Sequence, residues 1–364
     1  MRSYVRWGLL LALAAAVLVG RAETGAFPAV TTRVSVDSAG NEANGASYSP
    51  AMSVDGRYVA FASAGSNLVP GDTNGTDDMF VHDRQTGATE RVSVDSLGKQ
   101  ANASSGSSAI SDDGRYVGFG SYASNLVPGD TNGNSDVFVH DRQTAGTTRV
   151  SVDSAGNQGN GPSESPAMSA NGRYVSFGSG SSNLVPGDTN GFGDIFVHDR
   201  HTGTTTRASV DSAGNQGNGH SWSPAISADG RYVAFQSDAS NLVSGDTNGT
   251  SDIFVHDRQT GVTRRVTVDS AGNQGNSGSG GRDISADGRY VAFESVASNL
   301  VPGDTNGVSD IFAHDRGPDP VGGMAELPDV SGPSVPYAAL AGGLAAALAF
   351  AAGGWYARKR WLRQ

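Results

Sequence analysis

A unit of 58 residues occurs five times in this chain, and this repeat constrains the fold more than any other feature. The segment Ser53–Phe61 (SVDGRYVAF) returns in closely similar form starting at Ser111, Ser169, Ser227 and Ser285. The segment GDTNG, at 71–75, returns at the same spacing in every copy. Because no copy carries an insertion, the central part of the chain is one structural unit used five times.

Each copy has the pattern of several short strands. In the first copy the predicted strands are Ser49–Ser53, Arg57–Ser63, Met79–His82 and Thr89–Asp95. Tight turns are expected at Asp55-Gly56 and over Arg84–Gly87, where turn-forming residues separate the apolar segments. Four strands per copy without a helical period predict the blade of a β-propeller.

The copies also resemble a known repeat. The pattern SxDGRYVAFxS, followed by DIFVHDRQTG, is similar to the WD40-like, TolB-type β-propeller repeat over about Ala29 to Arg316. The resemblance implies an all-β propeller, but such propellers serve many functions. Blades of that family have about 40 residues, so two connections in each copy are longer here.

The two ends of the repeat array predict how the ring closes. The fifth copy stops at Asp315-Arg316 without a fourth strand, and an unassigned strand, Thr32–Asp37, precedes the first copy. Pairing this strand with Ile311–His314 would complete a five-bladed propeller and remove an exposed edge. The alternative is an open array.

Charge is distributed unevenly and indicates export. The formal net charge is −11, but residues 1–22 and 358–364 contain only basic charges, which leaves 18 basic against 36 acidic residues between them. Residues 1–22, with an apolar stretch of 13 residues from Trp7 to Val19, predict a signal peptide. An uncleaved N-terminal anchor is the alternative. The acidic body argues against nucleic-acid binding, and the absence of Cys excludes disulfides and thiolate zinc sites.

The C-terminal part predicts a membrane anchor. Residues 317–336 are rich in Pro and Gly and indicate a stalk, while residues 337–357 are free of charge and long enough to span a bilayer. The basic tail at 358–364 favours a cytoplasmic C-terminus, with the repeats outside the cell. The segment Leu327–Gly332 only partly matches a sortase signal, so a plain anchor is the preferred interpretation.

Long loops on one face of the predicted propeller carry a repeated DxNGxxD motif. Ca²⁺ prefers several oxygen ligands, and Asp and Asn at alternating loop positions with a glycine at the bend can supply them, so the motif suggests calcium binding. An Asp near the end of each fourth strand was expected to join each cluster. The alternative is that these residues only form Asx turns. The candidate ligands are Asp72, Asn74, Asp78, Asp95, Asp130, Asn132, Asp136, Asp153, Asp188, Asn190, Asp194, Asp211, Asp246, Asn248, Asp252, Asp269, Asp304, Asn306, Asp310 and Asp37.

Two further patterns have candidate roles. A repeated His-Asp-Arg places histidines at 82, 140, 198, 256 and 314, and we interpret them as packing residues rather than metal ligands. Positions at which the copies differ predict one asymmetric ligand pocket near the channel entrance, although sequence drift at exposed positions is the alternative. The candidate ligand-binding residues are Tyr48, Glu164, His220, Trp222 and Arg282.

The sequence shows no catalytic constellation. It lacks a nucleophile elbow, a zinc-protease motif and, without Cys, any thiol nucleophile. The resulting expectation is a surface-anchored binding or scaffolding module that meets an extracellular protein or polysaccharide. A purely structural surface protein and a propeller glycoside hydrolase are the alternatives, and Glu164 is the distinctive acid for the latter.

Overall fold

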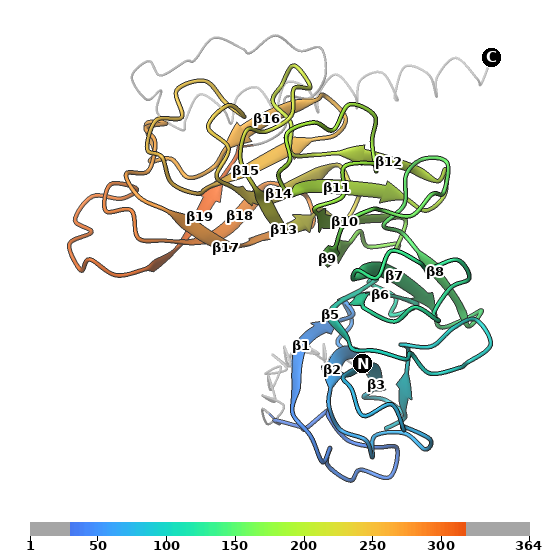
Figure 1. Cartoon of the computed structure of the whole chain (residues 1–364). Helices are drawn as coiled ribbons and strands as arrows, with labels where there is room; N and C mark the ends of the chain where they lie inside the picture. Colours follow the sequence, from blue (N-terminus) through green and yellow to red (C-terminus); the bar gives the residue numbers. More distant parts are fainter. Residues whose placement is uncertain (1–29, 318–364) are drawn as a thin grey trace, which may run out of the picture. The chain divides into compact units, whose positions relative to one another are not determined.

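The computed structural model describes residues 30–317, and all regular structure within them is β. The predicted signal peptide, membrane span and tail, and nearly all of the stalk, lie outside these residues. Within residues 30–317 there is no helix long and apolar enough to cross a membrane. The strands form five consecutive antiparallel sheets (Figure 1), which we call blades 1 to 5.

The strand bounds repeat from blade to blade. Blade 1 comprises β1 (Ser47–Met52), β2 (Tyr58–Ser63), β3 (Asp78–Asp83) and β4 (Thr89–Arg91). Blade 2 comprises β5 (Ser105–Ile110), β6 (Tyr116–Ser121), β7 (Asp136–Asp141) and β8 (Gly146–Arg149). Blade 3 comprises β9 (Ser163–Met168), β10 (Tyr174–Ser179), β11 (Asp194–Asp199) and β12 (Thr204–Arg207). Blade 4 comprises β13 (Ser221–Ile226), β14 (Tyr232–Ser237), β15 (Asp252–Asp257) and β16 (Val262–Arg265). Blade 5 has only β17 (Ser279–Ile284), β18 (Tyr290–Ser295) and β19 (Asp310–Asp315).

Each blade is a simple up-and-down meander, as the repeat predicts. The short turn at Asp55-Gly56 joins the first two strands, and the turn after Asp83 joins the last two, so both lie at the same end of the blade. Arg57 bridges these turns with two hydrogen bonds to the Asp83 carboxylate, of 3.0 and 2.7 Å. The long connections lie at the opposite end, where Asn74 of one donates to the carbonyl of Ala101 in the other at 3.0 Å.

The predicted fourth strand is longer than the observed one. The ladder of β4 ends at Arg91, and the chain then leaves the sheet, so that Val94 pairs with Gln100 in a small hairpin. The Val94 carbonyl accepts a hydrogen bond of 2.5 Å from Thr147 Oγ1 of blade 2. The end of the predicted strand therefore serves as the link between neighbouring blades.

Apolar side chains fill the space between blades. One cluster contains Met79 and Val81 from blade 1 together with Phe119 and Phe138 from blade 2, all fully buried. Equivalent clusters join the later blades. Burial of these faces against one another is the main favourable contribution to blade stacking.

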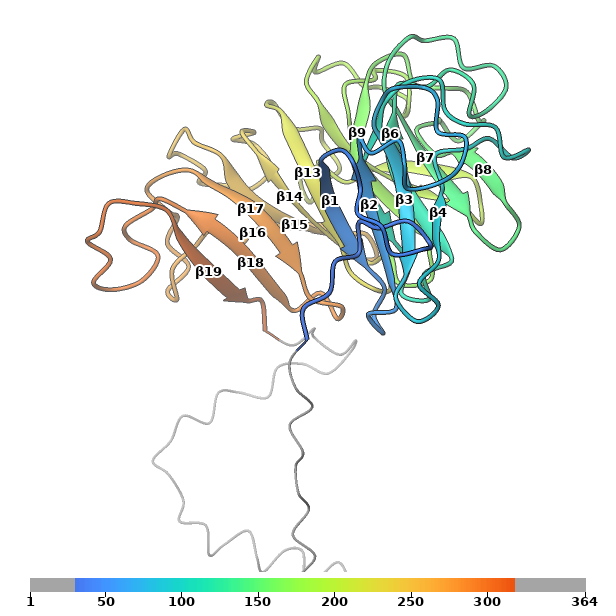
Figure 2. The ribbon, with the colours of Figure 1, turned by 90° about the horizontal axis from the view of Figure 1, so that it is seen from below.

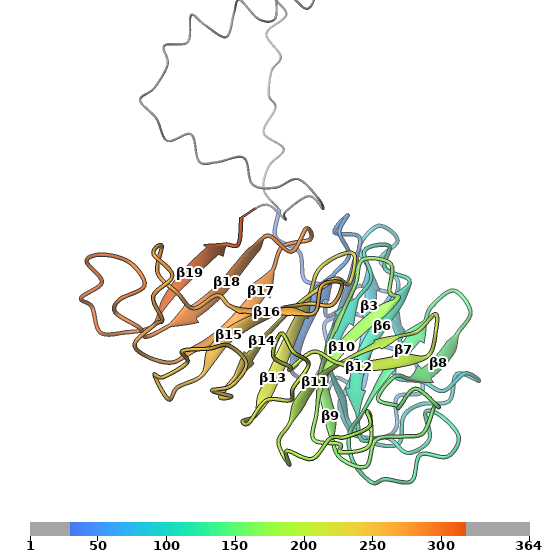
Figure 3. The ribbon, with the colours of Figure 1, turned by 90° about the horizontal axis from the view of Figure 1, so that it is seen from above.

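The expected closure through the N-terminal strand is not formed in this structure. β19 pairs with β18 alone, and blade 5 contains three strands. Residues 35–38 lie against blade 1, where the Val36 carbonyl accepts a hydrogen bond from Thr89 Oγ1, as the Val94 carbonyl does from Thr147 in the next blade. Blade 1, in blue, and β19, in orange, lie apart in all three views (Figures 1, 2 and 3).

Candidate functional site

The repeated Asp residues of the DxNGxxD motif surround an arginine. In blade 1 the Arg91 guanidinium lies 3.6 Å from both Asp72 and Asp78, and Gln100 donates to the same two carboxylates at 2.8 and 2.9 Å. The corresponding arginines of blades 2 to 4 lie 3.2–3.5 Å from their Asp pairs. These arginines are Arg149, Arg207 and Arg265. An internal cation therefore supplies the counter-charge in blades 1 to 4.

The register of the last hairpin explains why Asp95 is not part of this cluster. Phe80 lies opposite Arg91, which places Ser93 opposite Asp78, and Ser93 donates to that carboxylate at 2.6 Å. Asp95 instead accepts hydrogen bonds from the backbone amides of Leu97 and Lys99. The equivalent residues cap the same turn in their own copies; they are Asp37, Asp153, Asp211 and Asp269.

Asn74 also has a structural role in its loop. Its side chain donates to Asp78 at 3.1 Å and accepts a hydrogen bond from the amide of Thr76. Burial raises the pKa of Asp78, and the hydrogen bonds from Ser93 and Gln100 oppose this shift. Within residues 30–317 no three His, Cys, Asp or Glu side chains are grouped so that they could hold a metal ion.

Four of the five repeated histidines, at 82, 140, 198 and 256, are buried between strands, and His314 is partly buried. The Thr89 hydroxyl donates its proton to the Val36 carbonyl, so it accepts from Nδ1 of His82, at 2.8 Å. His140, His198 and His256 make the same bond with their threonines. Burial lowers the pKa of these histidines, to about 4 for His256. They are neutral packing residues at pH 7.

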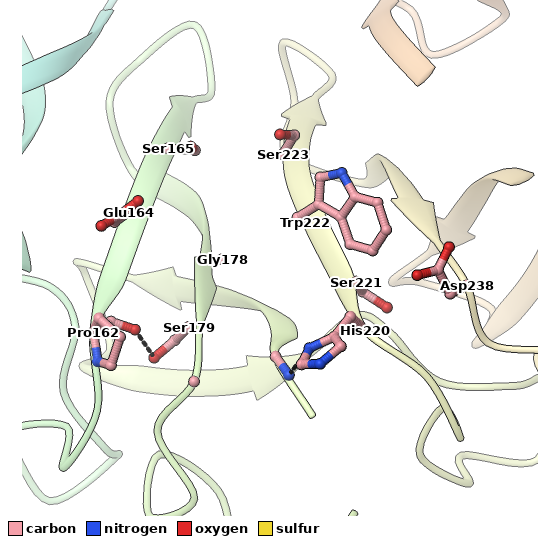
Figure 4. Close-up of a pocket in the computed structure, with 12 residues that line it drawn as sticks. Pro162, Glu164, Ser165, Gly178, Ser179, His220, Ser221, Trp222, Ser223 and Asp238 are labelled. Carbon is pink, nitrogen blue, oxygen red and sulfur yellow. Dashed lines mark hydrogen bonds between the residues drawn. The ribbon is translucent and has the colours of Figure 1, made fainter. Parts of the chain in front are cut away.

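A hollow between blades 3 and 4 contains the side chains that most clearly break the repeat. It has a volume of about 510 Å³. Its lining consists of Pro162, Glu164, Ser165, Gly178, Ser179, Gly180, Gly193, His220, Ser221, Trp222, Ser223 and Asp238. Figure 4 shows Glu164 on β9 and Trp222 on β13, the first strands of blades 3 and 4, with the indole turned toward Asp238. Three of the five predicted ligand-binding residues thus line one hollow, although the Glu164 carboxylate points away from Trp222 (Figure 4) and accepts a hydrogen bond from Ser135 of blade 2 at 3.2 Å.

Three glycines create this hollow. Gly178, Gly180 and Gly193 line it, all on the blade 3 side. Where blade 3 has Gly178, blade 4 has Gln236 and blade 5 has Glu294; where it has Gly180, blade 2 has Tyr122. A Cβ atom added at Gly178 or Gly180 would lie 3.7 Å or more from its nearest neighbour, which is an ordinary contact distance. The space is therefore open because these side chains are absent.

The walls of the hollow are held by neighbouring groups. His220 accepts a hydrogen bond at Nδ1 from the Gly193 amide, at 2.9 Å, and its ring packs edge-on against Phe192 with 5.0 Å between centroids. Asp238 accepts a 2.5 Å hydrogen bond from Ser251. These contacts fix the imidazole and one carboxylate, while Trp222 remains partly exposed. No lysine or arginine lines the hollow.

The other two predicted ligand-binding residues lie elsewhere. Tyr48 lines a smaller hollow of about 210 Å³ between blades 1 and 2, where Glu164 also reaches. Burial and the carboxylate of Asp77 raise the pKa of Tyr48 to about 12. Arg282 lines neither hollow, and burial lowers its pKa to about 10.

Asp238 and the three glycines were missed by the sequence analysis. The available signal was a comparison of the five copies at positions equivalent to 178, 180 and 193, where blade 3 alone has glycine at two or more of them. A glycine at a variable position is a weaker sign of a binding site than a tryptophan, because it adds no functional group. The absence matters only once the fold shows that the three positions face one space.

Comparison with known proteins finds likenesses of fold alone. No protein-family model matches the chain, and no curated protein is significantly similar to it. TolB from Acinetobacter baumannii is 19% identical, with 70% of this chain and 53% of that chain covered and a TM-score of 0.43. A putative TolB from Agrobacterium tumefaciens is 18% identical, with 74% and 83% covered and a TM-score of 0.44. A structure from a study of two prolyl endopeptidases is 14% identical, with 74% and 34% covered and a TM-score of 0.43.

Proposed function

We propose that this chain is an exported, surface-anchored binding module whose hollow between blades 3 and 4 holds a sugar unit of an extracellular polysaccharide or glycoprotein. The observation that carries the proposal is the coincidence of Trp222, Glu164, His220 and three glycines at one place in an otherwise regular repeat. Random drift at exposed positions would scatter such departures over the five copies.

The chemistry of the lining favours a hydroxyl-rich ligand. Trp222 offers an apolar aromatic surface, and the Asp238 carboxylate accepts hydrogen bonds from hydroxyl groups. Glu164 also lines the hollow, with its carboxylate bonded to Ser135 of blade 2 at 3.2 Å. Because no lysine or arginine of residues 30–317 lines the hollow, a neutral sugar fits better than an anionic one. A few fixed polar groups beside an aromatic wall are typical of small-molecule sites.

A glycan microarray followed by calorimetry tests this proposal. Trp222→Ala should weaken binding about thirtyfold or more, because a buried aromatic anchor contributes about 2 kcal/mol. Gly180→Tyr places in blade 3 the side chain that blade 2 has as Tyr122, and it should block the hollow without disturbing the fold. Tyr48 occupies in blade 1 the repeat position that Trp222 occupies in blade 4, so Tyr48→Ala is the matched control for Trp222→Ala.

Retained binding in both Trp222→Ala and Gly180→Tyr, with unchanged circular dichroism, would contradict the proposal that this hollow binds the sugar.

The same array tests the enzymatic alternative, which one observation favours: two carboxylates, Glu164 and Asp238, line the same hollow. Turnover of a bound glycan that Glu164→Gln loses would make the protein a glycoside hydrolase. A purely structural surface protein would bind nothing on the array.

The proposed location rests on the ends of the chain. Mass spectrometry of the mature protein should show a new N-terminus after Ala22, and protease added to intact cells should release the repeat region. Retention of residues 1–22 would indicate an N-terminal anchor instead.

A further inference from the structure

The junctions between consecutive blades are copies of one interface. In the first three junctions, Arg142 stacks over the ring of Tyr58 at 4.3 Å, Arg200 over Tyr116 at 4.3 Å and Arg258 over Tyr174 at 4.5 Å. Each interface has a forward half, the tyrosine of the earlier blade, and a rear half, the arginine and a glycine of the next blade. Gly114 lies so close to Tyr58 that an added Cβ would be 2.1 Å from its ring.

A row of backbone hydrogen bonds runs through the same junctions. The amide of Val54 donates to the carbonyl of Asp112 at 3.2 Å, and the pattern continues from Asp112 to Ala170 at 2.8 Å. The next two bonds, from Ala170 to Ala228 and from Ala228 to Ala286, are 2.9 Å long. Within residues 30–317 this row leaves the amide of Ala286 and the carbonyl of Val54 as its two open ends.

Blade 5 presents an uncovered forward half. Tyr290 is 44% exposed, whereas Tyr232 at the same position in blade 4 is 2% exposed. Ile311 is 78% exposed, whereas its equivalent Ile253 is fully buried in the cluster between blades 4 and 5. The face of blade 5 therefore has the apolar side chains of a junction without the next blade.

Blade 1 presents the matching rear half. Arg84 donates to the Gly56 carbonyl at 2.6 Å, as Arg142 does to Gly114, but within the described residues no ring lies beneath it. Among residues 30–317 no tyrosine approaches Gly56, and Met52 is 57% exposed. The two open faces of the array are thus complementary in shape and chemistry.

The N-terminal segment also matches the strand that blade 5 lacks. Thr31–Asp37 (TTRVSVD) aligns with Thr89–Asp95 (TERVSVD) of blade 1. In blade 2, Asp136 receives a 2.6 Å hydrogen bond from Ser151 and lies 3.2 Å from Arg149. Within the described residues, its equivalent in blade 5, Asp310, receives one side-chain hydrogen bond, from the Asn306 side-chain amide at 2.8 Å.

The N-terminal segment contains the arginine and serine that would be the partners of Asp310. Arg33 and Ser35 occupy the positions of Arg149 and Ser151, and Arg33 forms an exposed ion pair with Glu42. This segment is tied to blade 1 by Val36 and Ser38, as each internal link is tied to the blade that follows it. It therefore extends away from blade 1 toward the place of a preceding blade.

We propose that a second copy of this chain supplies that preceding blade, so that copies associate head to tail. Blade 1 and Thr31–Asp37 of one copy would cover blade 5 of another and complete its fourth strand. The four internal junctions share the glycine–tyrosine contact and the backbone hydrogen bond, and they leave the two ends of one chain apart (Figures 1, 2 and 3). Joining a second copy therefore requires no change within the blades. Such an asymmetric contact produces a ring of copies if the rotation closes, or a filament if it does not.

Disulfide trapping in the full chain, purified in mild detergent, tests this proposal, because the native sequence has no cysteine. The internal pair Val255 and Arg264 predicts that Ala313 and Thr32 lie opposite each other. Thr32→Cys with Ala313→Cys should form disulfide-linked dimers and larger species under mild oxidation. Thr31→Cys with Ala313→Cys is the control, since a shift of one residue places the thiol on the other face of the strand.

Disulfides confined to single chains would overturn the proposal and indicate closure within one copy. Equal trapping in both cysteine pairs, or no trapping at all, would also overturn it. Light scattering gives an independent measurement: Ile311→Glu should weaken self-association at least tenfold and leave the melting temperature of the dissociated chain unchanged. Leu97→Glu alters a residue that is 95% exposed in a loop away from both faces and should leave association intact.

Discussion

At the scale of single residues, the most consequential side chain is the arginine that ends each fourth strand. Arg149 lies between two carboxylates with small exposed fractions, Asp130 and Asp136. Its removal would leave two buried negative charges without a counter-ion, and an unpaired buried charge is far more costly than an exposed one. The arginine thus supplies an internal counter-charge for the two carboxylates.

We therefore expect Arg149→Met to lower the free energy of unfolding by about 3–5 kcal/mol in urea denaturation. Glu90→Gln, which breaks the more exposed pair with Arg142, should cost less than about 1 kcal/mol. We also expect millimolar Ca²⁺ to leave the melting temperature of the native chain unchanged relative to EDTA. A rise of several degrees with Ca²⁺ would instead support the calcium interpretation of the DxNGxxD loops.

The buried histidines predict a loss of stability in mild acid. The unfolded state binds a proton at a pKa of about 6.5, whereas burial lowers the pKa of folded His256 to about 4. Between these values the unfolded state holds more protons, so stability falls as the pH falls from about 6.5 to 4. Between pH 7 and pH 5, His256 should lower the free energy of unfolding by on the order of 2 kcal/mol.

Urea denaturation at pH 7 and pH 5 measures this effect. His256→Gln should reduce the difference between the two pH values, even if the variant is less stable at both. His201→Gln changes an exposed histidine of blade 3 and should leave the difference as in the native chain. An equal effect of the two substitutions would show that burial of His256 is not the cause.

At the scale of elements, the first turn of a blade determines how closely that blade approaches the preceding one. Gly172 has φ +69°, and an added Cβ would lie 2.3 Å from the ring of Tyr116 in the preceding blade. Gly56 of blade 1 has nearly the same φ, +70°, but its nearest neighbours would lie at 3.5 Å or more. The two positions therefore share a backbone conformation and differ in contact.

Substitution by alanine separates these two effects. Gly172→Ala should destabilise the chain by about 2–5 kcal/mol, from the left-handed conformation and the overlap with the tyrosine together. Gly56→Ala should cost only the conformational part, about 1–2 kcal/mol, at protein concentrations too low for self-association. Equal losses of stability in chemical denaturation would show that the junction contact contributes nothing.

At the scale of the whole repeat region, stability should decline toward blade 5. Every residue of β11 is buried, whereas residues of β19 alternate between partly buried and exposed. In a linear array each blade is stabilised by its neighbours, and a terminal blade has one neighbour fewer.

Hydrogen exchange followed by mass spectrometry should detect this gradient. In a dilute sample the amides of β19 are expected to exchange much faster than those of β11, because the outer edge of β19 has no paired strand. Protection of β19 should increase with protein concentration if copies associate. Uniform protection of both strands in the dilute sample would be inconsistent with an open terminal blade.

The sequence by itself determined the repeat, the four-strand unit and the positions of its turns. These features depend on local patterns, namely alternating apolar residues and turn-forming glycines, and each pattern recurs often enough to be recognised without distant contacts. The sequence also predicted that Trp222 and Glu164 lie on neighbouring blades, because they occupy the same position in consecutive copies.

Only the tertiary structure decided which groups meet across strands and blades. A difference of two residues in hairpin register placed Ser93 rather than Asp95 opposite Asp78, and it brought Arg91 beside the carboxylates. The hollow depended on Gly178 and Gly180, whose importance lies in side chains that are absent. Val36 and Ser38 bond to Thr89 of blade 1 as each internal link bonds to the blade after it, so these bonds leave the fourth-strand position of blade 5 undecided. The tertiary structure decided it: within the described residues β19 pairs with β18 alone, because the ends of the array lie too far apart for the segment to reach it (Figure 1).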